Sequence, residues 1–279
     1  MSNPMIRSLT VMADGERVKG LNRVSVTGRE SLGLEPLPFI LRAWNPDDSA
    51  HAMLAAAKTI TVLRENSLLA AGQAAGVYRR TVPEGMITEV VFSPNLALWE
   101  APVSLSVEAG ASVSDTVQRI LNASGTGIRL LTCAGPDPVF SRGQAFRGRA
   151  AECVNDVLSA VPARAYMTEA GLCAAPAEGL PVSLTLTESD LTDVPVFTGG
   201  KMILRTKPAG WPLGKRAKVK WKNESAEGLV TERSIDADTM KGKWLAEIIL
   251  KMQNAEFRIQ NSEFRMISGD RFVYGLLLS

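Results

Sequence analysis

Histidine is almost absent from this chain, because His51 is the only one among 279 residues. Histidine is the usual general base near neutral pH and the commonest metal ligand in proteins. Its scarcity weakens any enzymatic hypothesis and excludes metal sites built on several histidines. His51 lies in Asp48–Leu54, the opening turn of an expected short helix, so we expect a surface or capping histidine and not a catalytic one.

Cysteine is scarce as well. The three cysteines Cys133, Cys153 and Cys173 are evenly scattered and form no CxxC pair of the kind that binds zinc. Each sits among Ala, Leu and Val residues. We therefore expect small buried apolar side chains and not reactive thiols.

Long apolar runs and an excess of one charge are also missing. No run approaches the roughly 18 apolar residues of a membrane-spanning helix, so we expect no membrane anchor. The first ten residues hold a single arginine and no apolar stretch typical of a secretory signal, so the chain is expected to be made in a cytoplasm. The net charge of +2 gives no global indication of binding to nucleic acid or to an anionic membrane.

Catalytic motifs are absent. The sequence has no GxSxG nucleophile motif, no GxGxxG after a strand and no GxxxxGK[ST] phosphate loop. Asp236 and Asp238 resemble the start of a calcium loop but lack its glycine and terminal glutamate. Glu84, Glu89 and Glu100 lie near strand ends, as acids do in many proteins. We expect no catalytic, cofactor-binding or metal-binding residues, and a chain that is not an enzyme.

The residues that are present predict a mainly β fold of the α+β type. Hydrophobic residues make up 46% of the chain and charged residues 22%, enough apolar surface for a sizeable core. Short β-branched segments separated by turns predict a first small β-barrel over residues 1–108. The expected elements are strands at 6–11, 18–28, 39–44, 59–63, 70–81, 86–92 and 103–107, and a helix at 49–58.

The middle of the chain changes character. Ser112 is a typical cap for a helix over Thr116–Ser124, which Gly125 ends, and a second helix is expected over Arg147–Val161. With flanking strands, these helices predict an inserted α/β region over residues 109–181. Strands return afterwards and predict a second β-barrel over residues 182–253. Its expected strands are 184–186, 201–207, 216–222, 229–235 and 244–252.

The last segment, residues 254–279, contains a tandem duplication. Asn254–Gln260 reads NAEFRIQ, and Asn261–Ile267 reads NSEFRMI. Two heptads fall short of the three or four that indicate a coiled coil. We expect a tail appended to the second barrel.

Two further patterns each allow two interpretations. A stripe of basic residues is either a guard against edge-to-edge aggregation or a charged inter-subunit face; it comprises Lys215, Arg216, Lys218, Lys220 and Lys222. The tryptophans are either core residues or a platform that stacks on carbohydrate; they are Trp44, Trp99, Trp211, Trp221 and Trp244. Trp221 should point to the core side of its strand, so sequence-specific recognition of nucleic acid is not expected.

The layout from Ile6 to Met252 resembles the baseplate or tail-tip hub family of tailed bacteriophages, including its late control D-like group. Residues 6–44 and 59–92 look like the family's first tube-like barrel. Residues 109–117, with 142–158, look like its inserted α/β region. The segments 211–219 (WPLGKRAKV) and 235–244 (IDADTMKGKW) look like its closing barrel.

The resemblance implies a structural role. A hub of this kind is a homotrimer whose two tube-like barrels per chain present six similar faces to a sixfold tail tube, while three chains match a trimeric spike or tip. It implies location in the virion tail after synthesis in a host cytoplasm, no cofactor, and partners among the tail tube, spike or tip and tape measure proteins. The alternatives are a module that binds cell-wall glycan, suggested by the tryptophans, and a carboxylate-based hydrolase.

Overall fold

The computed structural model describes residues 7–133, 137–161, 163–168, 170–176, 182–222, 224–252 and 265–266. Strands predominate in these residues and form sheets of fourteen, three and two strands, accompanied by four α-helices and one short 3-10 helix. The predicted mainly β class is therefore confirmed.

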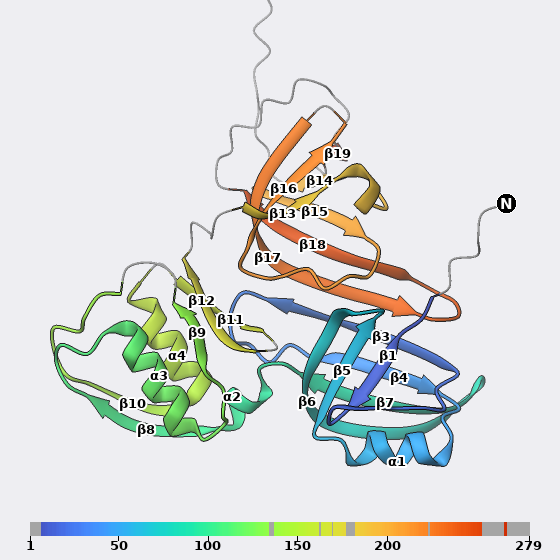
Figure 1. Cartoon of the computed structure of the whole chain (residues 1–279), viewed down its shortest axis with the longest axis horizontal. Helices are drawn as coiled ribbons and strands as arrows, with labels where there is room; N and C mark the ends of the chain where they lie inside the picture. The colour runs from blue at the N-terminus through green and yellow to red at the C-terminus, as the bar shows by residue number, and fades with distance from the viewer. Residues whose placement is uncertain are drawn as a thin grey trace, which may run out of the picture.

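The N-terminal strands form one antiparallel arm of the largest sheet, in the order β3-β4-β7-β6-β5-β1-β2. The bounds are β1 Thr10–Ala13, β2 Glu16–Arg17, β3 Arg23–Ser31, β4 Phe39–Trp44, β5 Thr59–Arg64, β6 Ser67–Val82 and β7 Gly85–Ser93. Helix α1 (Asp48–Ala56) begins where the Asp47 side chain accepts a hydrogen bond from the Ala50 amide, a typical N-cap. Figure 1 shows α1 packed beside this arm.

The middle region packs two helices against two small sheets. Its elements are α2 Leu96–Glu100, β8 Pro102–Val107, α3 Val113–Ser124, β9 Leu130–Cys133, β10 Gln144–Arg149, α4 Ala150–Ser159, β11 Ala163–Thr168 and β12 Gly171–Pro176. Helices α3 and α4 touch each other, the β8–β10 pair and the β11-β12-β9 sheet. Ser112 caps α3, and Gly125 ends it at φ 67°, as the sequence predicts.

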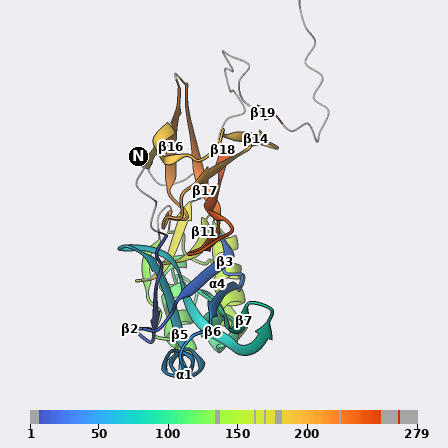
Figure 2. The same cartoon turned by 90° about the vertical axis from the view of Figure 1, so that its right-hand side faces the viewer.

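The C-terminal strands continue the largest sheet. They are β13 Val182–Leu186, β14 Val196–Thr198, β15 Lys201–Thr206, β16 Arg216–Trp221, β17 Glu224–Asp238, β18 Trp244–Met252 and β19 Arg265–Met266, with the 3-10 helix η1 at Glu188–Asp190. Strand β17 pairs with β16 in its first part and with β3 in its second part. The chain's two β-rich ends therefore share one fourteen-stranded sheet (Figures 1 and 2).

Because both β-rich ends belong to one sheet, the two separate β-barrels predicted at 1–108 and 182–253 are not confirmed. No sheet of the described residues closes on itself, and β17 joins the two arms through β3. The reason is the length of β17, because its 15 residues are enough to pair with a different strand at each end. The four-way division of the chain stays a prediction, and the duplicated tail lies outside the described residues apart from β19.

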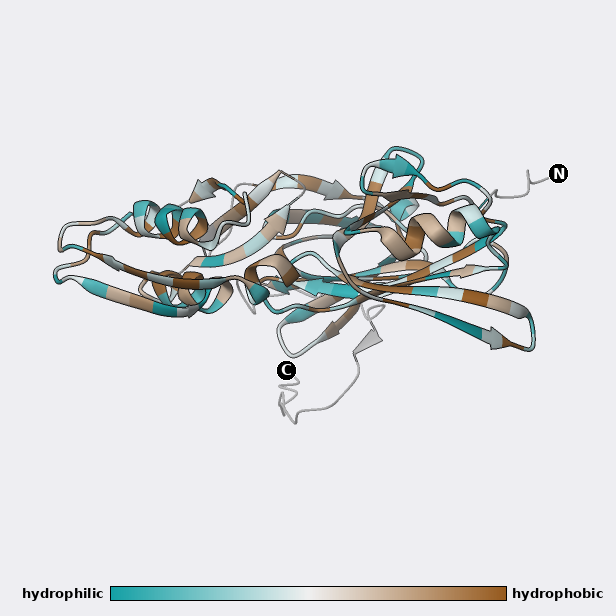
Figure 3. Cartoon of the chain, turned by 90° about the horizontal axis from the view of Figure 1, so that it is seen from below, coloured by the Kyte–Doolittle hydropathy of each residue, from teal (hydrophilic) through white to brown (hydrophobic). Residues whose placement is uncertain are grey.

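Three apolar cores hold the molecule together. The first lies under the N-terminal arm, where Phe39 stacks on Phe92 with ring centroids 5.6 Å apart, and it also contains Ile235 from β17. The second surrounds α3 and α4, and the third lies between the C-terminal strands. Leu32 enters the third core and Leu34 the second, so the segment after β3 links the cores. Hydrophobic and hydrophilic residues alternate along many strands (Figure 3), as expected where one sheet face is buried.

Candidate functional site

The most extensive functional feature is the side of the large sheet that faces away from the apolar cores. We call it the open sheet face and define it by the outward side chains of β3, β4, β7, β17, β18 and β15. Most of its members are half-buried or exposed, and the residues between them are mostly buried. Register places Ile40 beside Val91 and Ile249 beside Ile203, so apolar patches recur along this face.

Ion pairs between strands of the sheet lie among these apolar patches. Glu89 pairs with Arg42 at 2.7 Å and with Arg80 at 2.8 Å. Farther along the sheet, Arg205 pairs with Glu247 at 3.4 Å, and Lys201 with Glu232 at 3.1 Å. The face thus has the mixed polar and apolar character of an ordinary protein surface, which non-obligate protein–protein interfaces share.

A hollow of about 400 Å³ lies on this face between the β6–β7 turn and the β17–β18 loop. At its floor, Arg23 pairs with Asp238 at 2.6 Å. Burial acts to raise the pKa of Asp238, but hydrogen bonds from Arg23 and from the Met240 and Lys241 amides outweigh it and hold the pKa below its usual range. The pair fixes the β17–β18 loop against β3.

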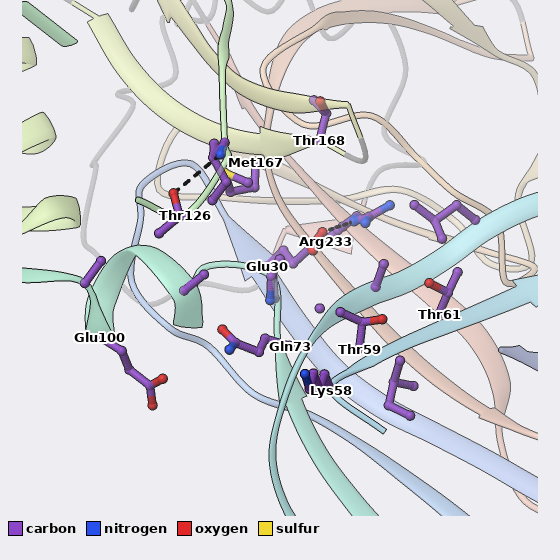
Figure 4. A pocket seen from close by; sticks show the side chains of 18 residues that line it. Glu30, Lys58, Thr59, Thr61, Gln73, Glu100, Thr126, Met167, Thr168 and Arg233 are labelled. Carbon is purple, nitrogen blue, oxygen red and sulfur yellow. Dashed lines mark hydrogen bonds and ion pairs between the residues drawn. The ribbon is translucent and has the colours of Figure 1, made fainter. Parts of the chain in front are cut away.

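A groove runs across the junction of the three cores, and we call it the junction groove; Figure 4 shows the side chains that line the larger of its two cavities. Two adjoining cavities of about 810 and 620 Å³ form it, and both are lined by Glu30, Arg233, Leu68, Met167 and Thr168. Glu30 and Arg233 form an ion pair of 2.5 Å whose side chains are only 10% and 11% exposed. Because Arg233 also donates to the Trp211 carbonyl at 3.1 Å, this pair ties β3, β17 and the Trp211 loop together.

The residues that the sequence analysis considered for catalysis or metal binding do not come together in the structure. His51 is half-buried on α1 and does not cap the helix; its Nδ1 lies 2.9 Å from the hydroxyl of Thr88, which is fully buried. Asp236 pairs with Lys243 at 3.4 Å, and Asp238 pairs with Arg23. No group of three or more metal-ligating side chains occurs within the described part of the chain.

The cysteines are free. Cys153 and Cys173 are buried, as predicted, whereas Cys133 is half-buried. Burial and nearby carboxylates raise the pKa of the Cys133 and Cys153 thiols, so both stay protonated and poorly nucleophilic. Burial, together with a hydrogen bond to Cys173, raises the pKa of Tyr166 to about 12.

The tryptophans contribute to packing inside the protein. All five are half-buried, and Trp211 contacts two of the three cores while its Nε1 donates to the Thr206 hydroxyl at 2.8 Å. Trp99 donates to the Leu34 carbonyl, and Arg23 lies 3.9 Å above the ring of Trp44. These contacts favour the core interpretation over a platform that stacks on carbohydrate.

The position of β16 in the sheet bears on the two interpretations of the basic stripe. Strand β16, which carries Arg216, Lys218 and Lys220, has β13 on one side and β17 on the other. It is therefore an interior strand as far as Val219, where Arg216 and Lys218 guard no sheet edge, whereas Lys220 lies beyond the end of β13. Alternation along β16 buries Ala217 and Val219, as predicted, and leaves the cations on the outer side.

Sequence reasoning missed the open sheet face because it expected separate barrels. The relevant signal was the alternation of polar and apolar residues in β3 and β17. It identified each strand but not its partner, because the pairing joins residues as far apart as Glu30 and Arg233, 203 positions along the chain.

Comparison with known proteins finds solved structures that are similar to this chain. No protein-family model matches the sequence, and no curated protein matches it. A tail protein from Neisseria meningitidis MC58 has a similar structure, with a TM-score of 0.65 at 12% identity over 88% of this chain and 96% of that chain. The 43 kDa tail protein of prophage MuSo2 from Shewanella oneidensis gives 0.64 at 10% identity over 88% and 96%.

A third similar structure is the Escherichia coli c3393 protein, a component of the type VI secretion system that is similar to the T4 bacteriophage tail proteins gp27 and gp5. Its TM-score is 0.64 at 13% identity, over 88% of this chain and 77% of that chain. At such identities the likeness shows a shared fold. None of the helices in the described residues has the length and apolar character needed to cross a membrane.

Proposed function

We propose that this chain is a non-enzymatic structural subunit of a phage tail, or of a phage-derived device, and specifically a hub of the tail tip or baseplate. Three copies form the hub, which adapts a sixfold tail tube to a trimeric spike or tip. Its partners are the tail tube, the spike or tip and the tape measure proteins, and its place is the virion tail.

One observation carries the proposal: a single sheet runs through both β-rich ends of the chain, and the helices of the described residues leave one broad face of it uncovered. Both arms contribute to this face, so three copies present six sheet arms, the number that a sixfold tube requires. The shared fold with phage tail proteins supports the same role. The scattered placement of the acids, His51 and the thiols favours a role through interfaces.

The first experiment is a solution mass by light scattering over a wide concentration range. We expect a species of about 90 kDa, three times the 30.0 kDa of one chain. A chain that stays monomeric at high concentration, alone and when co-expressed with its neighbours, would contradict the hub.

The open sheet face can be tested with Ile249→Glu. Ile249 is half-buried there beside Ile203, so a carboxylate should leave the fold intact while disrupting an apolar contact between chains. We expect association to weaken roughly tenfold, as when an interface anchor is lost. Val139→Glu is the matched control, because Val139 is 61% exposed and lies outside the face. Equal association of the two variants would exclude the face as a contact between copies.

A further inference from the structure

Within the part of the chain that the structure describes, strand β13 is an edge strand without the protection that edges usually carry. Its only partner among the described residues is β16, which it meets in parallel. Its sequence, Val-Ser-Leu-Thr-Leu, is rich in residues that favour strands and contains no lysine, proline or acid. Val182 is 40% exposed, and Ser183 and Thr185 are exposed too. Natural edge strands normally carry charges, proline or a cover that prevents pairing with another chain.

Cations lie one strand inward from this edge. Register sets Thr185 of β13 beside Lys218 of β16, on the exposed side of both strands. Lys220 follows on the same side, is exposed, and forms no ion pair with any described residue. Arg216 and Lys218 share one carboxylate, Glu227, at 3.3 and 3.6 Å. The exposed side of these strands therefore carries uncompensated positive charge.

We propose that the β13 edge is a strand-addition site for an extended protein segment with acidic side chains at alternate positions. The added strand hydrogen-bonds to β13, and its acidic side chains face Lys218 across β13 and Lys220 just beyond the end of β13. The open edge supplies backbone hydrogen bonds, and the cations select the partner's charge. The surface lies on the β16–β17 end of the molecule, opposite α1 (Figures 1 and 2).

The spacing suits this arrangement. Neighbouring strands lie about 4.8 Å apart, so an added strand sits about 10 Å from β16. The Lys218 side chain on β16 and a glutamate side chain on the added strand together reach across that distance over Thr185. Lys220 lies beyond Leu186, where β13 ends. A protein segment fits better than a nucleic acid, because no described aromatic on this side is exposed enough to stack a base; Trp221 is half-buried.

The test uses the full chain and a short synthetic peptide in which glutamate alternates with valine. We expect saturable binding that weakens as salt is added, and slowed amide exchange confined to residues 182–186. Lys218→Glu combined with Lys220→Glu should weaken binding roughly tenfold or more. The matched control, Arg17→Glu with Lys19→Glu, reverses two exposed cations at the other end of the fold and should bind the peptide normally.

Two further probes separate strand addition from general attraction between charges. A peptide with the same acids but alternate N-methylated amides should not bind, because it cannot complete the ladder. A third peptide carries lysine in place of each glutamate and should not bind either. The proposal is overturned if the N-methylated or the lysine peptide binds as well as the original one, or if amide exchange slows at residues away from β13. It is also overturned if single-stranded DNA binds with the same dependence on the lysines. The mass measurement above is independent of these outcomes, so the hub and the strand site can fail separately.

Discussion

At the scale of single residues, the buried ion pair of Glu30 and Arg233 is the most consequential contact. It joins β3 to β17, and thereby the two arms of the sheet, at the floor of the junction groove. A buried pair often adds little net stability compared with apolar residues, but removing one partner leaves an uncompensated charge. Its main effect is to fix how the two arms meet.

We therefore expect Glu30→Ala to lower the free energy of unfolding by about 3–5 kcal/mol, because Arg233 stays buried without its carboxylate. Replacing both residues, Glu30→Leu with Arg233→Met, should recover part of that loss. Asp115→Ala is the control, because the Asp115–Arg119 pair is about half exposed and its loss should cost roughly 0.5 kcal/mol. Urea titrations measure all three, and equal losses for Glu30→Ala and Asp115→Ala would refute this assignment.

The lowered pKa of Asp238 predicts a pH dependence. A carboxyl whose folded-state pKa lies below the unfolded value adds stability that is complete above the unfolded pKa, near 3.9, and is lost as the pH falls through the folded value. Wild type should thus exceed Asp238→Asn in free energy of unfolding at pH 7. The difference should shrink toward pH 3. Urea unfolding of both proteins across this range measures it, and a constant difference would contradict the role of Arg23.

At the scale of elements, strands and helices with strong local signals could be predicted from the sequence. Phe39–Trp44 and Trp244–Met252 have the predicted bounds, because alternating apolar residues and flanking turns define them locally. Helix α3 was found through its Ser112 cap and its Gly125 end. Helix α2 was missed, because its five residues are too few to show a helical period.

The longest strand shows why the remainder could not be predicted. Residues 223–228 lie between the expected strands 216–222 and 229–235, yet Glu224–Gly228 pair with β16, and β17 continues to Asp238. Polar residues in a twisted hairpin resemble a turn in composition, so the pattern cannot reveal the extra length. Without that length the two arms looked like separate barrels, and the open sheet face had no counterpart in the sequence.

At the scale of the whole molecule, the shared sheet predicts cooperative unfolding. Leu41 belongs to the first core and Leu250 to the third, and both side chains are fully buried. Leu41→Ala and Leu250→Ala should each lower the free energy of unfolding by about 2–5 kcal/mol and shift one common transition. Calorimetry would show this. Two transitions, with only one moved by each substitution, would mean that the arms fold independently.

The assembly role rests on how copies of this sheet meet one another. The proposed hub, which adapts a sixfold tube to a threefold spike, is a closed ring of three chains, in which two arms per chain give six similar positions. Electron microscopy of the purified chain, alone or with its tail-tube partner, tests this most directly. We predict class averages with threefold symmetry and six sheet arms around a common axis. Single chains, or rings of any other symmetry, would contradict the account.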